Sequence, residues 1–194
     1  MSITNKSNIF NTQRGMGIVE VLVAMLVLAV GVLGYSVLQL RAVSATNDAL
    51  TRSQAILILR GLSDSVRMNV VGQQSGNYQA TPGVFNQSGA PTAPGASCTN
   101  VSFANYCTPA AFAQWDAYQY ALIAFKMGIK INMLTCPGAV QSGAGSSPAR
   151  QCLLAAWGNT APTIGSNSTT VPYDCMQTAG TYNAVATCFE LEAY

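Results

Sequence analysis

The sequence contains no histidine and few charged residues. Asp, Glu, Lys and Arg make up 8% of its 194 residues, about a third of the usual share in soluble domains. Without histidine, the chain lacks the commonest general base and the commonest metal ligand. It has no nucleophile elbow and no phosphate-binding loop, and its aspartates are scattered: Asp48, Asp64, Asp116 and Asp174. We therefore expect neither an enzyme nor a bound metal or cofactor.

Basic residues are not clustered either. The formal net charge is +2, and Lys and Arg do not occur in runs. A protein that follows the phosphate backbone of a nucleic acid needs clustered positive charge. The sequence therefore does not predict direct nucleic-acid binding.

Cysteine is absent from the first half of the chain. An even number of cysteines in one part of a sequence favours disulfides formed in an oxidising compartment. A metal site is the weaker alternative, because no Cys-x-x-Cys spacing occurs. Our hypothesis, among the many connectivities that six cysteines allow, is that sequence neighbours pair: Cys98–Cys107, Cys136–Cys152 and Cys175–Cys188.

One long apolar run lies near the amino terminus. Residues 21–38 carry no charge, and with Gly17 to Val19 they form a stretch that spans ~30 Å as a helix, the thickness of a bilayer core. Lys6 and Arg14 precede the run, which orients the amino end toward the cytoplasm. A secretory signal would have a shorter run and a small-x-small cleavage site, so the remaining alternative is a plain signal anchor. We expect a transmembrane segment at about 17–39, with the rest of the chain outside the cytoplasm.

Glu20 stands out because it lies at the start of this apolar run. A carboxylate there costs about 2–3 kcal/mol unless it is paired. Cleavage between Gly15 and Met16 would explain it, since Glu20 would then lie in the first turn of a new helix. The helix dipole favours a negative charge at that position, and the carboxylate can pair with the new amino terminus of a neighbouring chain.

These residues resemble the prepilin signal of type IV pilins and type II secretion pseudopilins. That pattern is a short basic leader ending in Gly, followed by an apolar helix with Glu as its fifth residue. Gly15 and Glu20 match it and Arg14 supplies the leader charge, whereas Met16 stands where major pilins usually carry Phe. The resemblance implies a leader peptide at 1–15, cleavage of the Gly15–Met16 bond by prepilin peptidase, N-methylation of Met16, and a role for Glu20 in subunit assembly.

The helical pattern continues beyond the apolar run. Residues 41–69 contain no proline, and leucine and valine recur there at helical spacing, with Arg60 one turn from Asp64. We expect one helix over about 16–71, apolar in its first half and amphipathic in its second. Gly31 and Gly34 lower helix propensity and predict a local bend or melted turn.

A longer stretch resembles the PilV family of minor pilins, also described as type IV pilus modification proteins. The similarity covers residues 14–69 and ends on Asp64-Ser-Val-Arg-Met-Asn, although Asn69 follows Met68 directly where relatives usually insert one residue. It implies a structural minor pilin that acts in pilus assembly or initiation, and hence in twitching motility, adhesion or DNA uptake. The implied partners are major and minor pilins, prepilin peptidase and the assembly platform. The implied location is the bacterial inner membrane with a periplasmic head, then the pilus at the cell surface.

The remaining chain, residues 72–194, predicts a small globular head. Thr108-Pro109 is a helix start, and an aromatic face with core-packing spacing follows it: Phe112, Trp115, Tyr118, Leu122 and Phe125. Strands are expected at 129–133, 151–157 and 188–194, with Phe189, Leu191 and Ala193 on one face, and loops at 72–97, 137–150 and 158–172. The expected fold class is α+β and type IV pilin-like, with a long helix on a small, disulfide-linked antiparallel sheet.

Two other functions remain open. A minor pseudopilin of type II secretion would share the anchor, although its head is usually smaller and poorer in cysteine. A tip-displayed adhesin or DNA-binding module would differ in its ligand. The sequons at Asn100 and Asn167 are expected to be accidental.

Overall fold

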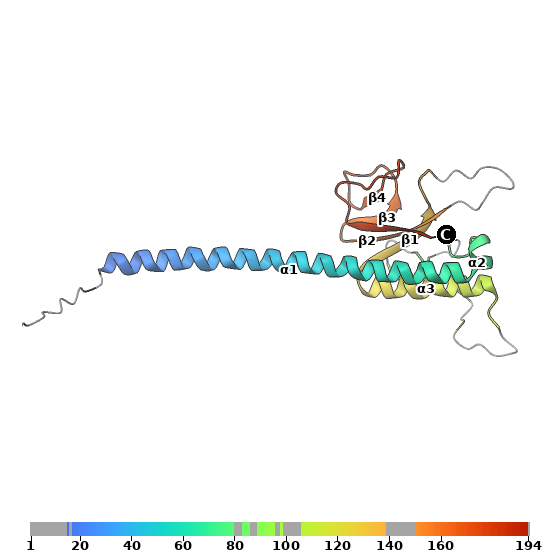
Figure 1. Ribbon diagram of the computed structural model, residues 1–194, viewed down its shortest axis with the longest axis horizontal. Helices are drawn as coiled ribbons and strands as arrows, with labels where there is room; N and C mark the ends of the chain where they lie inside the picture. The colour runs from blue at the N-terminus through green and yellow to red at the C-terminus, as the bar shows by residue number, and fades with distance from the viewer. Residues whose placement is uncertain are drawn as a thin grey trace, which may run out of the picture. The chain divides into compact units, whose positions relative to one another are not determined.

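The computed structural model describes residues 15, 17–79, 83–85, 89–95, 98, 106–138 and 150–193. Met16, nearly all of the leader and the Asn100 sequon therefore lie outside the described residues. The elements (Figure 1) are α1 (Ile18–Met68), α2 (Val70–Gln74), α3 (Pro109–Lys126), β1 (Ile129–Thr135), β2 (Gln151–Trp157), β3 (Thr160–Ile164), β4 (Tyr173–Met176) and β5 (Cys188–Ala193). The chain divides into two compact units, residues 1–46 and 47–194, and each is described by itself.

The first unit consists of the amino-terminal part of α1. The helix is unbroken across Gly31 and Gly34, so the melted turn expected there is absent. Valine, leucine and alanine side chains dominate this stretch and have no polar atoms that compete with the backbone hydrogen bonds. The cost of two glycines is therefore spread over a long cooperative helix.

In the second unit, α1 ends earlier than the expected Val71. Asn69 leaves the helical region with φ −113° and ψ 66°. Its Oδ1 accepts a hydrogen bond from the Gly72 amide at 3.1 Å and so caps the separate short helix α2. Asparagine side chains compete with helical hydrogen bonds in this way, which explains the break.

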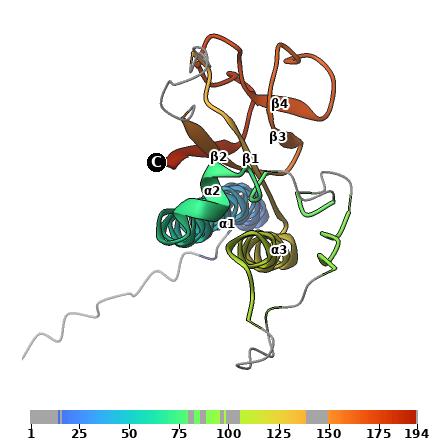
Figure 2. The ribbon, with the colours of Figure 1, turned by 90° about the vertical axis from the view of Figure 1, so that its right-hand side faces the viewer.

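The central sheet is antiparallel, in the order β1-β2-β5. Ile131 pairs with Ala155 and Leu153 pairs with Leu191. One face of this sheet packs against the second half of α1 and against α3, as Figure 2 shows. Phe189 and Leu191 pack on this core and Ala193 is buried within it, which confirms the expected face of β5. The long helix and small antiparallel sheet confirm the expected fold class.

The other face of the sheet is also covered, and sequence patterns did not predict this layer. Strands β3 and β4 form a two-stranded parallel sheet, so the loop expected at 158–172 was wrong over β3. Leu154 of β2 packs there with Cys175 and Met176. The register shifts next to Pro162, as expected where a proline interrupts a ladder, and this irregularity hid the strand.

Helix α3 begins as expected but turns a different face inward. Thr108 Oγ1 accepts a hydrogen bond from the Ala111 amide at 3.2 Å and Pro109 stands in the first turn. The buried residues, however, are alanines: Ala113, Ala117, Ala121 and Ala124. Phe112 and Phe125 are 44% and 45% exposed, so the expected aromatic core face was wrong. Small side chains allow α3 to lie close to its neighbours, and the helix–helix distance depends on them.

Three disulfides hold the second unit together. They join Cys98 to Cys107, Cys136 to Cys152 and Cys175 to Cys188, with Cα–Cα distances of 5.9, 4.9 and 5.8 Å. The last of them links β4 to β5 and therefore connects the two sheets.

Candidate functional site

Glu20 lies in the first turn of α1, where its amide donates to the Gly17 carbonyl at 2.9 Å. Its carboxylate forms no ion pair within the described part of the chain. A shallow hollow along the helix is lined by Glu20 with apolar neighbours: Val21, Ala24, Met25 and Leu28. The structure thus holds a charged group on an apolar surface, and none of the described residues pairs with it.

The apolar surface around Glu20 extends over the first half of α1. Large side chains there are mostly more than half exposed, for example Ile18 at 83% and Leu40 at 71%. By length and composition, α1 is the one helix among the described residues that is able to cross a membrane. A surface of this size and apolarity on a monomer marks a membrane or protein contact.

Gly15 is exposed, and its neighbour Met16 is outside the described residues. The geometry of the bond between them is therefore not described. The six cysteines belong to the other unit, where they are all in disulfides.

Two bonded cysteines lie beside a carboxylate in the second unit. Glu190 Oε1 is 2.8 Å from the sulfur of Cys152, which is bonded to Cys136. Neither sulfur is a thiolate, so in the described residues this cluster offers a metal one carboxylate and no thiolate ligand. Burial raises the pKa of Glu190, the nearby Glu192 adds to the increase, and Arg150 opposes it. The cluster is therefore a partly buried acidic group against a disulfide.

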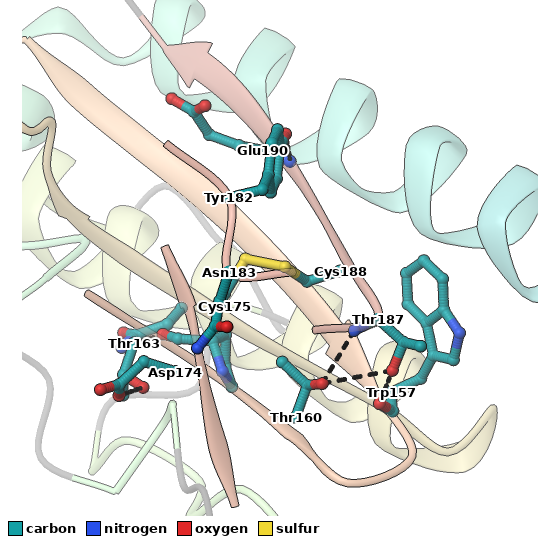
Figure 3. Close-up of a disulfide and its surroundings, with 12 residues drawn as sticks. Trp157, Thr160, Thr163, Asp174, Cys175, Tyr182, Asn183, Thr187, Cys188 and Glu190 are labelled. Atoms are coloured by element: carbon teal, nitrogen blue, oxygen red, sulfur yellow. Dashed lines mark hydrogen bonds between the residues drawn. A yellow bond between two sulfur atoms is a disulfide. The ribbon is translucent and has the colours of Figure 1, made fainter. Parts of the chain in front are cut away.

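A polar network lies where β2 ends, and Figure 3 shows three of its residues, Trp157, Thr160 and Thr187, beside the Cys175–Cys188 disulfide. Thr187 Oγ1 donates to the Trp157 carbonyl at 2.6 Å, and its amide donates to Thr160 Oγ1 at 2.9 Å. The Trp157 indole Nε1 donates to Asp48 Oδ1 of α1 at 3.0 Å. Sequence reasoning missed this pair, since the two residues are far apart in the chain and carry no shared motif.

The Asn167 sequon lies in a loop that its own side chain organises. Asn167 Nδ2 donates to the carbonyls of Thr170 and Pro172, each at 2.9 Å. The backbone amide of Asn167 donates to Asp174 Oδ2 at 2.8 Å, and the Asp174 carboxylate also accepts from the Thr163 hydroxyl. The side-chain nitrogen that glycosylation modifies is thus engaged within the loop, in line with an accidental sequon.

A second buried polar group lies between α1, α3 and the chain after α2. Tyr78 is 1% exposed, and its hydroxyl donates to the Ser65 carbonyl at 3.1 Å. Burial, with the negative charge of Asp116, raises the pKa of Tyr78 to about 12. Burial also raises the pKa of Asp116, opposed by a hydrogen bond with Ser65. The Tyr78 hydroxyl thus ties the chain after α2 to α1, and Asp116 of α3 lies close enough to raise its pKa.

Comparison with known proteins gives two matches. Residues 37–118 match a family model described as Type IV pilin Tt1218, and residues 10–36 match the prokaryotic N-terminal methylation motif. The first match covers the later part of α1, α2 and the first half of α3. No curated protein and no solved structure matches the chain.

The second match contains Gly15, Met16 and Glu20, the three residues that the amino-terminal pattern singled out. The first match agrees with the observed fold, a long apolar helix followed by a small disulfide-linked antiparallel sheet. Proteins of this kind are structural subunits rather than enzymes. Over these residues the chain is therefore similar to a type IV pilin family and to the prepilin N-terminal methylation motif.

Proposed function

We propose that this pilin is a PilV-like minor subunit of the type IV pilus that acts in pilus assembly or initiation. It is made as a prepilin with its leader at residues 1–15 and its head, residues 72–194, in the periplasm. Prepilin peptidase cuts between Gly15 and Met16, Met16 is N-methylated, and the subunit then leaves the inner membrane for the pilus. Its partners are the major and minor pilins and the assembly platform. Twitching motility, adhesion or DNA uptake would follow from pilus assembly.

The observation that carries the proposal is Glu20 on the exposed apolar surface of α1, with no ion-pair partner among the described residues. Burying one large aliphatic side chain contributes about 1.5–3 kcal/mol of favourable free energy, so covering this surface with lipid or protein is strongly favourable. A bilayer covers it before assembly, and helices of neighbouring subunits cover it afterwards. A plain anchor would gain nothing from a carboxylate at this depth.

Glu20 would set the register between subunits. A carboxylate in an apolar filament core is stable only when it is paired, and leaving it alone costs several kcal/mol. The amino terminus of Met16 on an adjacent subunit supplies the opposite charge. A subunit that slipped along its neighbours would lose this pair, so the pair selects one axial position.

The head favours a minor pilin over a type II secretion pseudopilin. Its three disulfides and its second sheet layer of β3 and β4 make a head larger and richer in cysteine than a pseudopilin usually has. For a tip-displayed DNA-binding module, the described head shows no dense basic patch, since its Lys and Arg residues are dispersed.

The test is expression in a piliated bacterium whose own copy of the gene is deleted. Mass spectrometry of the purified chain should show the amino terminus at Met16 with one added methyl group. Glu20→Gln, which keeps the shape but removes the charge, should be processed normally yet be missing from sheared pili. Glu20→Asp, which keeps the charge, is the matched control and should retain partial incorporation.

Two results would contradict the proposal. Normal incorporation of Glu20→Gln into pili would show that charge pairing does not set the register. Loss of protein secretion with normal piliation and twitching in the deletion strain would identify a pseudopilin instead.

A further inference from the structure

A groove in the second unit runs between α1 and β5. Four residues from successive turns of α1 and one residue of β5 line it: Arg60, Ser63, Asp64, Arg67 and Leu191. Its volume is about 290 Å³, enough for one or two side chains but small for a cofactor. The groove lies outside the amino-terminal segment on which the proposed function depends.

The charged residues of this groove are not paired with one another. The sequence suggested that Arg60 faces Asp64, yet in the described ranges the one ion pair within 4.0 Å joins Arg150 to Glu192. Arg60, Asp64 and Arg67 are all exposed. Arg60 and Arg67 are two helical turns apart, or ~10 Å along the axis, so both guanidinium groups are able to reach one bound group between them.

Ser63 supplies an unsatisfied hydroxyl at the floor of the groove. It is 3% exposed, and its side chain makes no hydrogen bond within the part of the chain that is described. Other hydroxyls of α1 behave differently, because Thr46 and Thr51 donate to carbonyls one turn earlier, at 2.9 and 3.0 Å. Buried hydroxyls nearly always have a partner, so the Ser63 hydroxyl indicates a ligand that accepts its hydrogen bond.

We propose that this groove receives an acidic side chain of a neighbouring pilus subunit. The carboxylate lies between Arg60 and Arg67 and accepts a hydrogen bond from Ser63, while an adjoining apolar side chain contacts Leu191. The identification of the partner as a pilus subunit rests on the proposed function. The carboxylate specificity rests on the groove alone.

The charges favour a protein carboxylate over a nucleic-acid phosphate. A polyanion needs several cations in succession, whereas Asp64 lies between the two arginines and repels a second negative charge. A single carboxylate flanked by neutral residues meets that repulsion only once, and the two guanidinium groups oppose it. The apolar wall of Leu191 likewise fits an aliphatic side chain better than a sugar-phosphate backbone.

The test uses the full-length chain in detergent micelles with nitrogen-15-labelled arginine. The probe is the peptide acetyl-Leu-Glu-Leu-amide, which carries one carboxylate, and its neutral control is acetyl-Leu-Gln-Leu-amide. The acidic peptide should shift the side-chain signals of Arg60 and Arg67 saturably, and the neutral peptide should leave them in place. No shift, or equal shifts with both peptides, overturns the proposal.

Variants localise the binding to the groove. The double change Arg60→Gln with Arg67→Gln should weaken binding of the acidic peptide about tenfold, whereas Arg52→Gln, on the same helix outside the groove, should not weaken it. Ser63→Ala should weaken binding severalfold without lowering the melting temperature, since the hydroxyl has no partner to lose. Asp64→Asn should tighten it. Unchanged affinity in the double variant overturns the proposal, as does a short oligonucleotide that binds more tightly than the peptide.

The proposal for the groove and the proposed function can be refuted independently of each other. If the peptide binds but the unaltered chain is absent from sheared pili, the carboxylate site stands and the pilus assignment is wrong. If the unaltered chain is present in pili but Arg60→Glu with Arg67→Glu is incorporated equally well, the pilus assignment stands and the groove has no acidic subunit partner.

Discussion

Asn69 ends α1 and connects three segments of the head. Its Oδ1 accepts from the Gly72 amide at 3.1 Å, and its Nδ2 donates to the Pro109 carbonyl at 2.7 Å. The first contact caps α2, and the second ties this junction to the start of α3. The Asn69 side chain therefore contacts both α2 and α3, which makes it a sensitive position for testing the structure.

Replacing Asn69 with alanine removes both contacts. Loss of an N-cap asparagine costs about 1 kcal/mol, and loss of a hydrogen bond between neutral groups costs about 1 kcal/mol more. The unfolding free energy should therefore fall by about 2 kcal/mol. Asn69→Ser separates the two terms, because serine is an equally good cap but has no amide group to donate to Pro109, so it should cost about 1 kcal/mol.

The measurement is urea unfolding of the full chain in detergent, followed by tryptophan fluorescence. Both tryptophans, Trp115 and Trp157, belong to the second unit and report on it directly. Asn47→Ala is the matched control, since Asn47 is an exposed asparagine of α1 whose side chain makes no hydrogen bond in the described residues. It should leave stability unchanged or slightly higher.

Two outcomes would contradict this account of Asn69. If Asn69→Ser is as stable as the parent, the bond to Pro109 contributes nothing. If Asn69→Ala and Asn69→Ser lose the same amount, the cap contributes nothing and α1 is able to continue into α2 without cost.

Three further predictions concern the head. The pKa of Asp116 is raised by burial, so its contribution favours the folded state below its unfolded pKa and is lost as pH rises through the folded pKa. Asp116→Asn should therefore raise the unfolding free energy at pH 7 and flatten its pH dependence above the unfolded pKa of about 3.9, and a steeper dependence would contradict this. In an absorbance titration of the phenols, one group should ionise at a pKa of about 12 and be missing in Tyr78→Phe, which should also lose about 1 kcal/mol with the bond to Ser65. Replacing Cys175 and Cys188 together by serine should lower the unfolding free energy by about 2–4 kcal/mol, and a change under about 1 kcal/mol would show that β4 is held by its other contacts.

Local patterns were enough to predict several elements. The start of α3 followed from Thr108-Pro109, because the cap and the fixed proline φ act within one turn. Strand β2 was predicted at Gln151–Trp157, and the inward face of β5 followed from simple alternation. In each case the deciding interaction lies within a few residues of the chain.

Other features depended on contacts that no local pattern contains. On α3, an aromatic set and an alanine set both recur at helical spacing, so periodicity alone cannot choose the buried face. Close approach of α2 and α3 decides it, since a Cβ on Gly72 of α2 would lie 2.8 Å from the Cβ of Ala113 on α3. Only small residues fit such a contact, and the aromatic residues are left at the margin of the core.

The amino-terminal segment and the head therefore differ in what determines them. Composition was sufficient to predict the apolar helix, because a run of about twenty residues with almost no charge satisfies its backbone hydrogen bonds as a helix and is covered by lipid or by other chains. The Asp48–Trp157 contact, the second layer of β3 and β4, and the groove between α1 and β5 appeared only in the folded chain. They join residues distant in sequence, and the free energy of such contacts depends on packing that one segment cannot specify by itself.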